Sequence, residues 1–256
     1  MKNPTGLTSV TFRHLSVRQI IDLTCQAGGQ GIEWGSDVHV KPEDLDHARL
    51  TGQLCRQAGL EVFSYGSYYK LNQGLNPQVE FRQLTQAALA LGAPLIRIWA
   101  GRTPSAQVSE AQMEQAVRET WQCCEIAREA GLQVAFEYHR RSLTDCADSA
   151  VNLMNRVNHP ALKLYWQPNP ELSEQENREE LKRIRPWLCR VHVFSWLPDN
   201  TRLPLREQQS RWQNWLSLID SSVPLLLEFV REDGEEQFRQ DLADLNRWLA
   251  EKTNAD

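Results

Sequence analysis

Residues 128–139 read REAGLQVAFEYH, and this stretch shows the unit from which the chain is built. A helix-like segment ends near Gly131, and apolar residues that favour an extended strand follow it. Glycine just past a helix can adopt the left-handed conformation of a C-terminal cap, and β-branched or aromatic residues then favour extension. The same order occurs in CQAGGQGIEWG, CRQAGLEVFSYG and LALGAPLIRIWAG, at residues 25–35, 55–66 and 89–101. The chain therefore repeats a helix–glycine–strand unit.

The second half of the chain continues this pattern with proline as the boundary residue. The segments NHPALKLYWQP, RPWLCRVHVFSW and SSVPLLLEFV, at residues 158–168, 185–196 and 221–230, are predicted strands that follow helical segments. With LTSVTF at residues 7–12 as the opening strand, the sequence contains eight strand–helix units about thirty residues apart, the size of a βα repeat.

Strictly alternating strands and helices predict a parallel sheet, and eight units in 256 residues predict a closed barrel. An open, doubly wound sheet would need a glycine-rich phosphate loop after its first strand, and TFRHLS at residues 11–16 is not such a loop. We therefore predict an α/β fold, a single (β/α)8 TIM barrel that spans residues 1–256.

Composition narrows the range of partners. The net charge of −5 gives no general attraction to nucleic acid or to anionic membranes. No apolar run approaches the roughly 20 residues of a membrane span. The N-terminus lacks the apolar core of a signal peptide and none of the six cysteines forms a CxxC pair, so we expect a cytoplasmic protein with reduced thiols.

A barrel of this kind carries its active site at the carboxyl ends of its strands. Glu137 and Glu228 lie inside the apolar runs VAFEY and LLLEFV, where a carboxylate is costly to bury unless it is paired or bound to a metal. Together with His192 they form a ligand set that suits Mn²⁺, Mg²⁺ or Co²⁺. The alternative is structural pairing, of Glu137 with Arg97 and of Glu228 with Arg231 or another arginine.

At these strand ends the chain resembles the xylose isomerase-like barrels, the sugar phosphate isomerase/epimerase superfamily. The resemblance covers nearly the whole chain, and its best segments are GIEWG, VAFEYHRRSLTDCADSAVNLM, LYWQP, RVHVFSW and LLLEFV. It implies a divalent metal, Mn²⁺, Mg²⁺, Co²⁺ or Zn²⁺, held by Glu137, Gln167, His192 and Glu228. It also implies that the two glutamates act as acid and base on a ketose, through an enediolate stabilised by the metal.

Further site residues come from the strand ends and from the loop after the seventh strand. Aromatic faces at strand ends can pack on the C–H surfaces of a sugar, although some of these rings must be core. In similar enzymes an arginine after the seventh strand holds substrate hydroxyls, and Arg202 in DNTRLPL is the nearest match, with a solvated loop arginine as the alternative. His139 could equally be an exposed loop histidine. We predict these substrate contacts: Tyr65, Arg97, His139, Trp166, Trp196 and Arg202.

Gln167 departs from the pattern of the resembling family, which usually has aspartate there, and Pro170 stands where a substrate-binding histidine often follows. An amide oxygen still coordinates a hard cation. Two glutamates, a neutral histidine and an amide balance the charge of a divalent cation, so we predict weaker binding and a more electrophilic metal than with aspartate. The alternative is loss of the metal role.

Three functions remain open at this stage. The first is a metal-dependent sugar isomerase or epimerase that acts on a small-molecule sugar, with an unphosphorylated ketose or related polyol favoured because no phosphate-binding glycine loop is present. The second is an apurinic endonuclease-like nuclease, disfavoured by the acidic charge and by SYGSYY at residues 64–69, where that branch needs a histidine. The third is a barrel that binds a sugar or a protein without turnover. A homo-oligomer is compatible with each.

Overall fold

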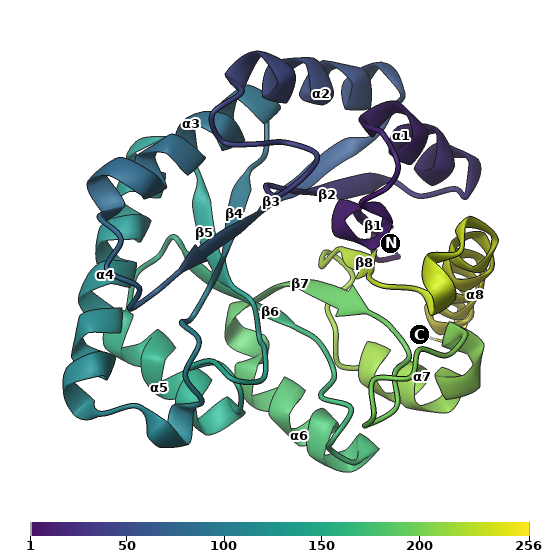
Figure 1. Cartoon of the computed structure of the whole chain (residues 1–256). Coiled ribbons are helices and arrows are strands. Elements are labelled where there is room, and N and C mark those ends of the chain that lie inside the picture. Colours follow the sequence, from purple (N-terminus) through teal and green to yellow (C-terminus); the bar gives the residue numbers. More distant parts are fainter. Residues whose placement is uncertain (1, 256) are drawn as a thin grey trace.

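Eight parallel strands close into a barrel, as the sequence predicts (Figure 1). The computed structural model describes residues 2–255, and side chains for residues 2–252. The first strand pairs with both the second and the last, so the sheet has no free edge. The strands are β1 Thr5–Thr8, β2 Gly31–Gly35, β3 Glu61–Lys70, β4 Leu95–Trp99, β5 Gln133–Phe136, β6 Leu162–Trp166, β7 Leu188–Val193 and β8 Leu225–Leu227.

The helices form a ring around the strands (Figure 1). Ser16, Ser109 and Ser173 begin the first, fourth and sixth helices with reciprocal capping boxes. Gly92 ends the third helix with a φ of 82°, the left-handed conformation that the sequence pattern requires. None of the described helices is long and apolar enough to cross a membrane. The helices are α1 Val17–Gln26, α2 Leu45–Gln57, α3 Arg82–Leu91, α4 Glu110–Glu129, α5 Ala147–Val157, α6 Glu174–Ile184, α7 Gln209–Leu216 and α8 Glu235–Ala255.

The opening strand is shorter than predicted. The segment LTSVTF leaves the sheet after Thr8, and Ser9–Phe12 form a turn of 3₁₀ helix. The hydroxyl of Ser9 accepts a 2.8 Å hydrogen bond from the backbone N–H of Gly35, so a side chain replaces the next rung of the ladder. This turn carries Arg13, which follows it, to the carboxyl end of the barrel.

Side chains on each strand alternate between the barrel interior and the layer that faces the helices. On β6, the outward Trp166 packs edge-on against Trp212 and Trp215 of α7, with ring centroids 6.1 and 5.5 Å away. Its neighbour Tyr165 points inward and donates a hydrogen bond to Glu33 of β2. Trp212 and Trp215 are themselves buried in the core.

Candidate active site

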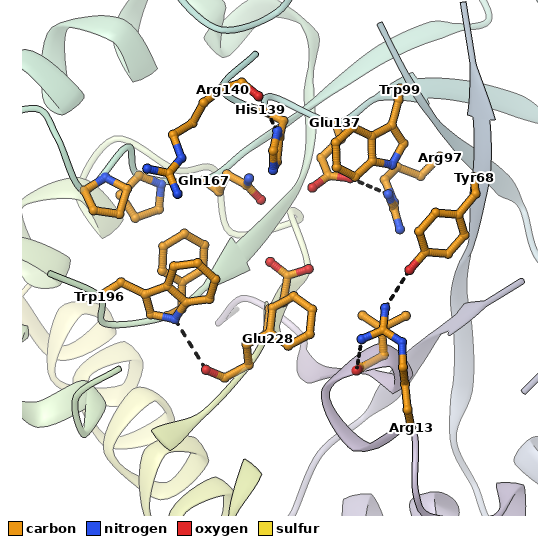
Figure 2. A pocket seen from close by; sticks show the side chains of 15 residues that line it. Arg13, Tyr68, Arg97, Trp99, Glu137, His139, Arg140, Gln167, Trp196 and Glu228 are labelled. Carbon is orange, nitrogen blue, oxygen red and sulfur yellow. Dashed lines mark hydrogen bonds and ion pairs between the residues drawn. The ribbon is translucent and has the colours of Figure 1, made fainter. Parts of the chain in front are cut away.

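A cavity of about 270 Å³ opens at the carboxyl ends of the strands (Figure 2). Its floor is polar and its walls are largely aromatic, which is the usual composition of a site for a small ligand. The lining residues are Val10, Arg13, Tyr68, Arg97, Trp99, Glu137, His139, Arg140, Gln167, Pro168, Pro170, Phe194, Trp196, Glu228 and Phe229.

Glu137 lies at the end of β5 and is held in the cavity by Arg97 of β4. Its backbone N–H continues the sheet by donating to the carbonyl of Ile98. The guanidinium of Arg97 donates from Nη1 to Oε2 of Glu137, and both side chains are buried. The pairing of Glu137 with Arg97 is therefore present, yet Glu137 also lines the cavity, so the pair orients the carboxylate toward the cavity as well as neutralising it.

His192 stands between Glu228 and Gln167 at the centre of the site. Its Nδ1 lies 3.0 Å from Oε1 of Gln167 and 3.4 Å from Oε2 of Glu228. One ligand atom from each of Glu137, His192 and Glu228 lies within 4.8 Å of the others. Glu228 contacts His192 and no arginine within 4.0 Å among the described residues, so pairing with Arg231 does not account for its burial.

Burial and charge set the protonation states of this cluster. Burial disfavours a charged imidazole, but Glu228 and Glu33 outweigh it and raise the pKa of His192 to about 10. Burial also raises the pKa of Glu228, while His192 and then Arg97 lower it, and the net pKa is below the ordinary value. In the absence of a metal, His192 is thus a cation at neutral pH and Glu228 is ionised.

Glu33 of β2 was not predicted as a site residue, yet it lies at the centre of the buried charged cluster. Its Oε2 accepts hydrogen bonds from Tyr165 at 2.6 Å and from Ser64 at 2.7 Å. Its Oε1 lies 3.4 Å from Nε of Arg97 and 3.4 Å from Nε2 of His192. Glu33 lies in the apolar run GIEWG, just as Glu137 and Glu228 lie in VAFEY and LLLEFV. The sequence therefore already indicated that Glu33 is a buried carboxylate.

The residues present fit a divalent cation. On binding a metal His192 would lose one proton and keep the proton on Nε2 that faces Glu33, so that Nδ1, beside the oxygens of Gln167 and Glu228, becomes a donor to the cation. The charges also agree: three glutamates (with Glu137) and Arg97 sum to −2 when His192 is neutral. Imidazole, amide and carboxylate donors suit a hard or borderline divalent cation.

Two predicted substrate contacts lie outside the cavity. Tyr65 is fully buried on the outer side of β3, and its hydroxyl donates to the carbonyl of Val40. Trp166 is buried against α7, as described above. Because side chains alternate along a strand, Trp166 and its neighbour Gln167 point to opposite sides, so both could not line one cavity. These two predictions are wrong for that reason.

The other predicted contacts fall in or beside the cavity. Arg97, His139 and Trp196 line it, and the imidazole of His139 lies against the ring of Trp99, with centroids 4.4 Å apart. Arg202 does not line it. Its guanidinium pairs with Asp233 and lies over Trp196 at 5.7 Å, so it supports the aromatic wall from behind.

The lining residues that were not predicted from the sequence include Arg13, Tyr68, Arg140 and Phe229. They lie in loops or at irregular strand ends, where no period predicts side-chain direction. Tyr68 is the clearest example, since the pairing of β3 with β4 shifts register between Gly66 and Lys70. Phe229 has a φ of 46°, a left-handed conformation that sequence alone does not announce for phenylalanine.

Comparison with known proteins agrees with this architecture. A family model described as "Xylose isomerase-like TIM barrel" matches residues 21–251. The chain belongs to this family. A 3-dehydroshikimate dehydratase from Bacillus anthracis is 23% identical over 200 residues, which cover 73% of this chain and 70% of that protein.

Several solved structures superpose on this chain over nearly its full length. The probable 3-DHS dehydratase AsbF of Bacillus anthracis gives a TM-score of 0.81 at 19% identity, covering 95% of this chain and 98% of that one. A D-allulose 3-epimerase from Methylomonas sp. gives 0.75 at 15% identity, covering 97% and 98%. A family member from Mycobacterium smegmatis, solved in complex with magnesium, gives 0.65 at 14% identity, covering 96% and 97%. At these identities the structural matches establish the fold.

Proposed function

We propose that this protein is a metal-dependent enzyme that isomerises or epimerises a hydroxyketone of the sugar type by moving a proton next to the carbonyl. One observation carries the proposal: Glu137 and Glu228, both buried, line one cavity, and one ligand atom from each lies within 4.8 Å of a ligand atom of the buried His192. The fold is shared with a D-allulose 3-epimerase, which supports this class of reaction.

The two glutamates have the environments that proton transfer requires. Glu228 is ionised at neutral pH, because His192 and Arg97 outweigh its burial, and can therefore accept a proton. Glu137 enters from the opposite side of the cavity (Figure 2), where Arg97 fixes its orientation. A substrate between them presents one face of its α-carbon to each carboxylate, so that a proton removed on one face can be returned on the other.

Glu137, Gln167, His192 and Glu228 would hold a divalent cation, which when bound polarises the carbonyl and so acidifies the neighbouring C–H. The aromatic wall of Phe194, Trp196 and Phe229 gives the apolar side of the substrate a surface to pack on. The same wall limits access of water to the intermediate enediolate.

A second reaction deserves a parallel test, because the relative identified by sequence comparison is a dehydratase. The first step is the same: a glutamate removes the proton next to the carbonyl. If a hydroxyl occupies the next carbon, its C–O bond breaks, the second glutamate protonates the leaving oxygen, and water and a C=C bond form. The substrate then decides between the two outcomes.

The test is hydrogen exchange in D₂O with Mn²⁺-loaded protein, followed by proton NMR on D-allulose, D-tagatose and 3-dehydroshikimate. We expect loss of the α C–H signal for at least one compound. Epimerisation gives an isomer of the substrate that carries one deuterium, whereas dehydration gives a product that has lost water. Glu137→Gln and Glu228→Gln should each slow exchange by at least about a hundredfold. Glu114→Gln, on the outer surface of α4, removes the same charge and should have no effect.

Absence of exchange in all three compounds with the wild-type protein overturns the proposal and leaves a barrel that binds without turnover. Exchange that survives in both active-site variants would show that the two glutamates are not the proton carriers. Calorimetric titration with Mn²⁺ first establishes that the protein is loaded, so that either exchange result reports on the proton transfer itself.

A further inference from the structure

One side of the cavity mouth carries an arginine that is held in a fixed orientation. The guanidinium of Arg13 donates from Nε to Asp37 at 2.7 Å, from Nη1 to the carbonyl of Val10 at 3.1 Å, and from Nη2 to the hydroxyl of Tyr68 at 2.7 Å. The ring of Phe229 lies against it at 5.7 Å. An arginine fixed by four neighbours loses little conformational entropy when it binds a ligand.

The contacts of Arg13 leave part of its hydrogen-bonding capacity for a ligand. A guanidinium has five N–H groups, and three of them have partners among the described residues. The side chain lines the cavity and is 42% exposed, so the remaining two N–H groups are accessible from the cavity. One lies on each terminal nitrogen, which is the arrangement that binds a carboxylate with two parallel hydrogen bonds.

Asp37 supports this role rather than cancelling it. Its Oδ2 accepts from Nε of Arg13 and, at 3.2 Å, from the hydroxyl of Tyr68, and Asp37 is not among the residues that line the cavity. It therefore holds the arginine from behind. Tyr68 does line the cavity, where its hydroxyl accepts the hydrogen bond from Arg13 (Figure 2) and itself donates to Asp37.

Lys70 adds positive charge on the same side. Its ammonium lies 5.8 Å from the ring centroid of Tyr68 and 4.9 Å from that of Trp99, two residues that line the cavity. Among the described residues it forms no ion pair with a carboxylate within 4.0 Å. This charge is thus unbalanced at close range and favours an anion near the mouth.

We propose that Arg13, with Tyr68 and Lys70 beside it, forms a subsite for a carboxylate of the substrate. Resting on the proposed function, this inference narrows the substrate class from neutral sugars to hydroxyketones that carry a carboxylate. Arg13 binds the carboxylate, Tyr68 holds the arginine in place, and Lys70 contributes the surrounding potential. Glu137 and Glu228 at the cavity floor act on the carbonyl end of the same molecule.

A carboxylate fits this subsite better than a phosphate. Phosphate sites are commonly built from several backbone N–H groups in a glycine-rich loop or at a helix N-terminus. The chain segment after β1 supplies a single arginine in a 3₁₀ turn instead. Two N–H groups on one guanidinium match the two oxygens of a carboxylate, and leave the third oxygen of a phosphate without a donor from Arg13.

The experiment compares three ketoses that differ only at C6. D-Fructose has a hydroxymethyl group there, D-fructuronate a carboxylate and D-fructose 6-phosphate a phosphate; D-tagatose, D-tagaturonate and D-tagatose 6-phosphate form a second set. Binding to the Mn²⁺-loaded protein is measured by calorimetry. In at least one set the carboxylate should bind about 10- to 100-fold more tightly than the hydroxymethyl compound, and more tightly than the phosphate.

Variants assign the preference to residues. Arg13→Gln should abolish the advantage of the carboxylate over the hydroxymethyl compound, and Tyr68→Phe should reduce this advantage partly. Arg140→Gln tests another arginine that lines the cavity, whose Nη1 and Nη2 are bound to Glu171 and Asn200, and should have the smaller effect. Arg49→Gln on the exposed face of α2 is the matched control and should have none. Melting temperatures verify that each variant folds.

Equal affinity for the carboxylate and the hydroxymethyl compound, or no binding of either carboxylate, overturns the inference. Tighter binding of the phosphate compound would show that the subsite prefers a phosphate to a carboxylate. An unchanged preference for the carboxylate in Arg13→Gln would show that Arg13 does not bind it. Because calorimetry measures binding without turnover, these outcomes are separate from the D₂O exchange result. Exchange on a neutral ketose together with no carboxylate preference would leave the proposed function standing without this subsite.

Discussion

Replacing Gln167 with aspartate tests the electrostatics of the proposed metal site. In the metal-free protein His192 carries a proton, since its pKa is raised to about 10. Binding a divalent cation to His192 releases that proton, so the net charge of the cluster rises by one. A new carboxylate near His192 interacts more favourably with the metal-bound cluster than with the protonated one, because the metal-bound cluster carries one more positive charge. The variant should therefore bind the metal more tightly.

The size of this effect follows from the spacing. Oε1 of Gln167 lies 3.0 Å from Nδ1 of His192. Two unit charges about 4 Å apart interact by about 4 kcal/mol at an effective dielectric constant of 20. This is an upper bound, because aspartate is one methylene shorter than glutamine and the new charge must be desolvated. We expect a 10- to 100-fold gain in Mn²⁺ affinity, or about 1.4–2.8 kcal/mol.

The assay is calorimetric titration of chelator-treated protein with Mn²⁺, comparing wild type, Gln167→Asp and Gln167→Asn. Asparagine has the length of aspartate without the charge, so the difference between the two variants isolates the electrostatic contribution. Saturating Mn²⁺ should raise the melting temperature of the aspartate variant by more than that of the asparagine variant, because ligand binding stabilises the folded protein in proportion to its affinity. Equal Mn²⁺ affinities for the two variants would refute the reasoning.

Three further predictions follow from the same structure. Because a cation must displace the proton of His192, Mn²⁺ affinity should rise about tenfold per pH unit between pH 6 and 8. Calorimetry in two buffers of different ionisation enthalpy should show that about one proton is released for each Mn²⁺ bound. An affinity that does not change with pH would contradict a protonated His192. Burial raises the pKa of Asp241 from 3.8 to about 6, so its contribution to stability is full below pH 3.8 and is lost as the pH rises through about 6. Asp241→Asn should thus raise the free energy of unfolding by up to about 3 kcal/mol at pH 8 and by little at pH 4, as measured by unfolding in urea. Equal effects at both pH values would show that Asp241 does not change its protonation state between them. Trp166→Ala should cost about 3–5 kcal/mol of stability without changing the affinity of the folded protein for a ketose. Trp196→Ala should instead weaken the binding of a ketose and leave stability largely unchanged. Melting temperature measures the stability and calorimetry the affinity, and the same pair of effects in both variants would contradict their placement on opposite sides of the sheet.

Strand number, helix ring and barrel closure were all predictable from the sequence, because each rests on local chemistry repeated along the chain. Helix-terminal glycines, proline boundaries and short apolar runs recur at a constant interval. The placement of Glu137, His192 and Glu228 together was predictable for a related reason. In a parallel barrel all strands end on one side, so polar residues at strand ends must meet there.

The wrong predictions of substrate contacts share one physical cause, the direction in which a side chain points from its strand. Tyr65 and Trp166 were placed at the site by their position near strand ends, yet alternation turns both toward the helices. Glu33 was visible as a buried carboxylate, but its contacts with residues of β3, β4, β6 and β7 arise only when the barrel closes. Its role as the shared partner of Arg97 and His192 could not be assigned from the chain order.

The sequence by itself determined the repeated βα unit, the family and the chemical character of the strand ends, because those depend on residues close together in the chain. Only the tertiary structure decided which charges meet, since that depends on distances between strands far apart in sequence. It fixed His192 between two carboxylates and an amide, and it brought Arg13 to the cavity mouth beside Tyr68, 55 residues further along the chain. The protonation state of the site and the charge of the ligand it can accept follow from those contacts.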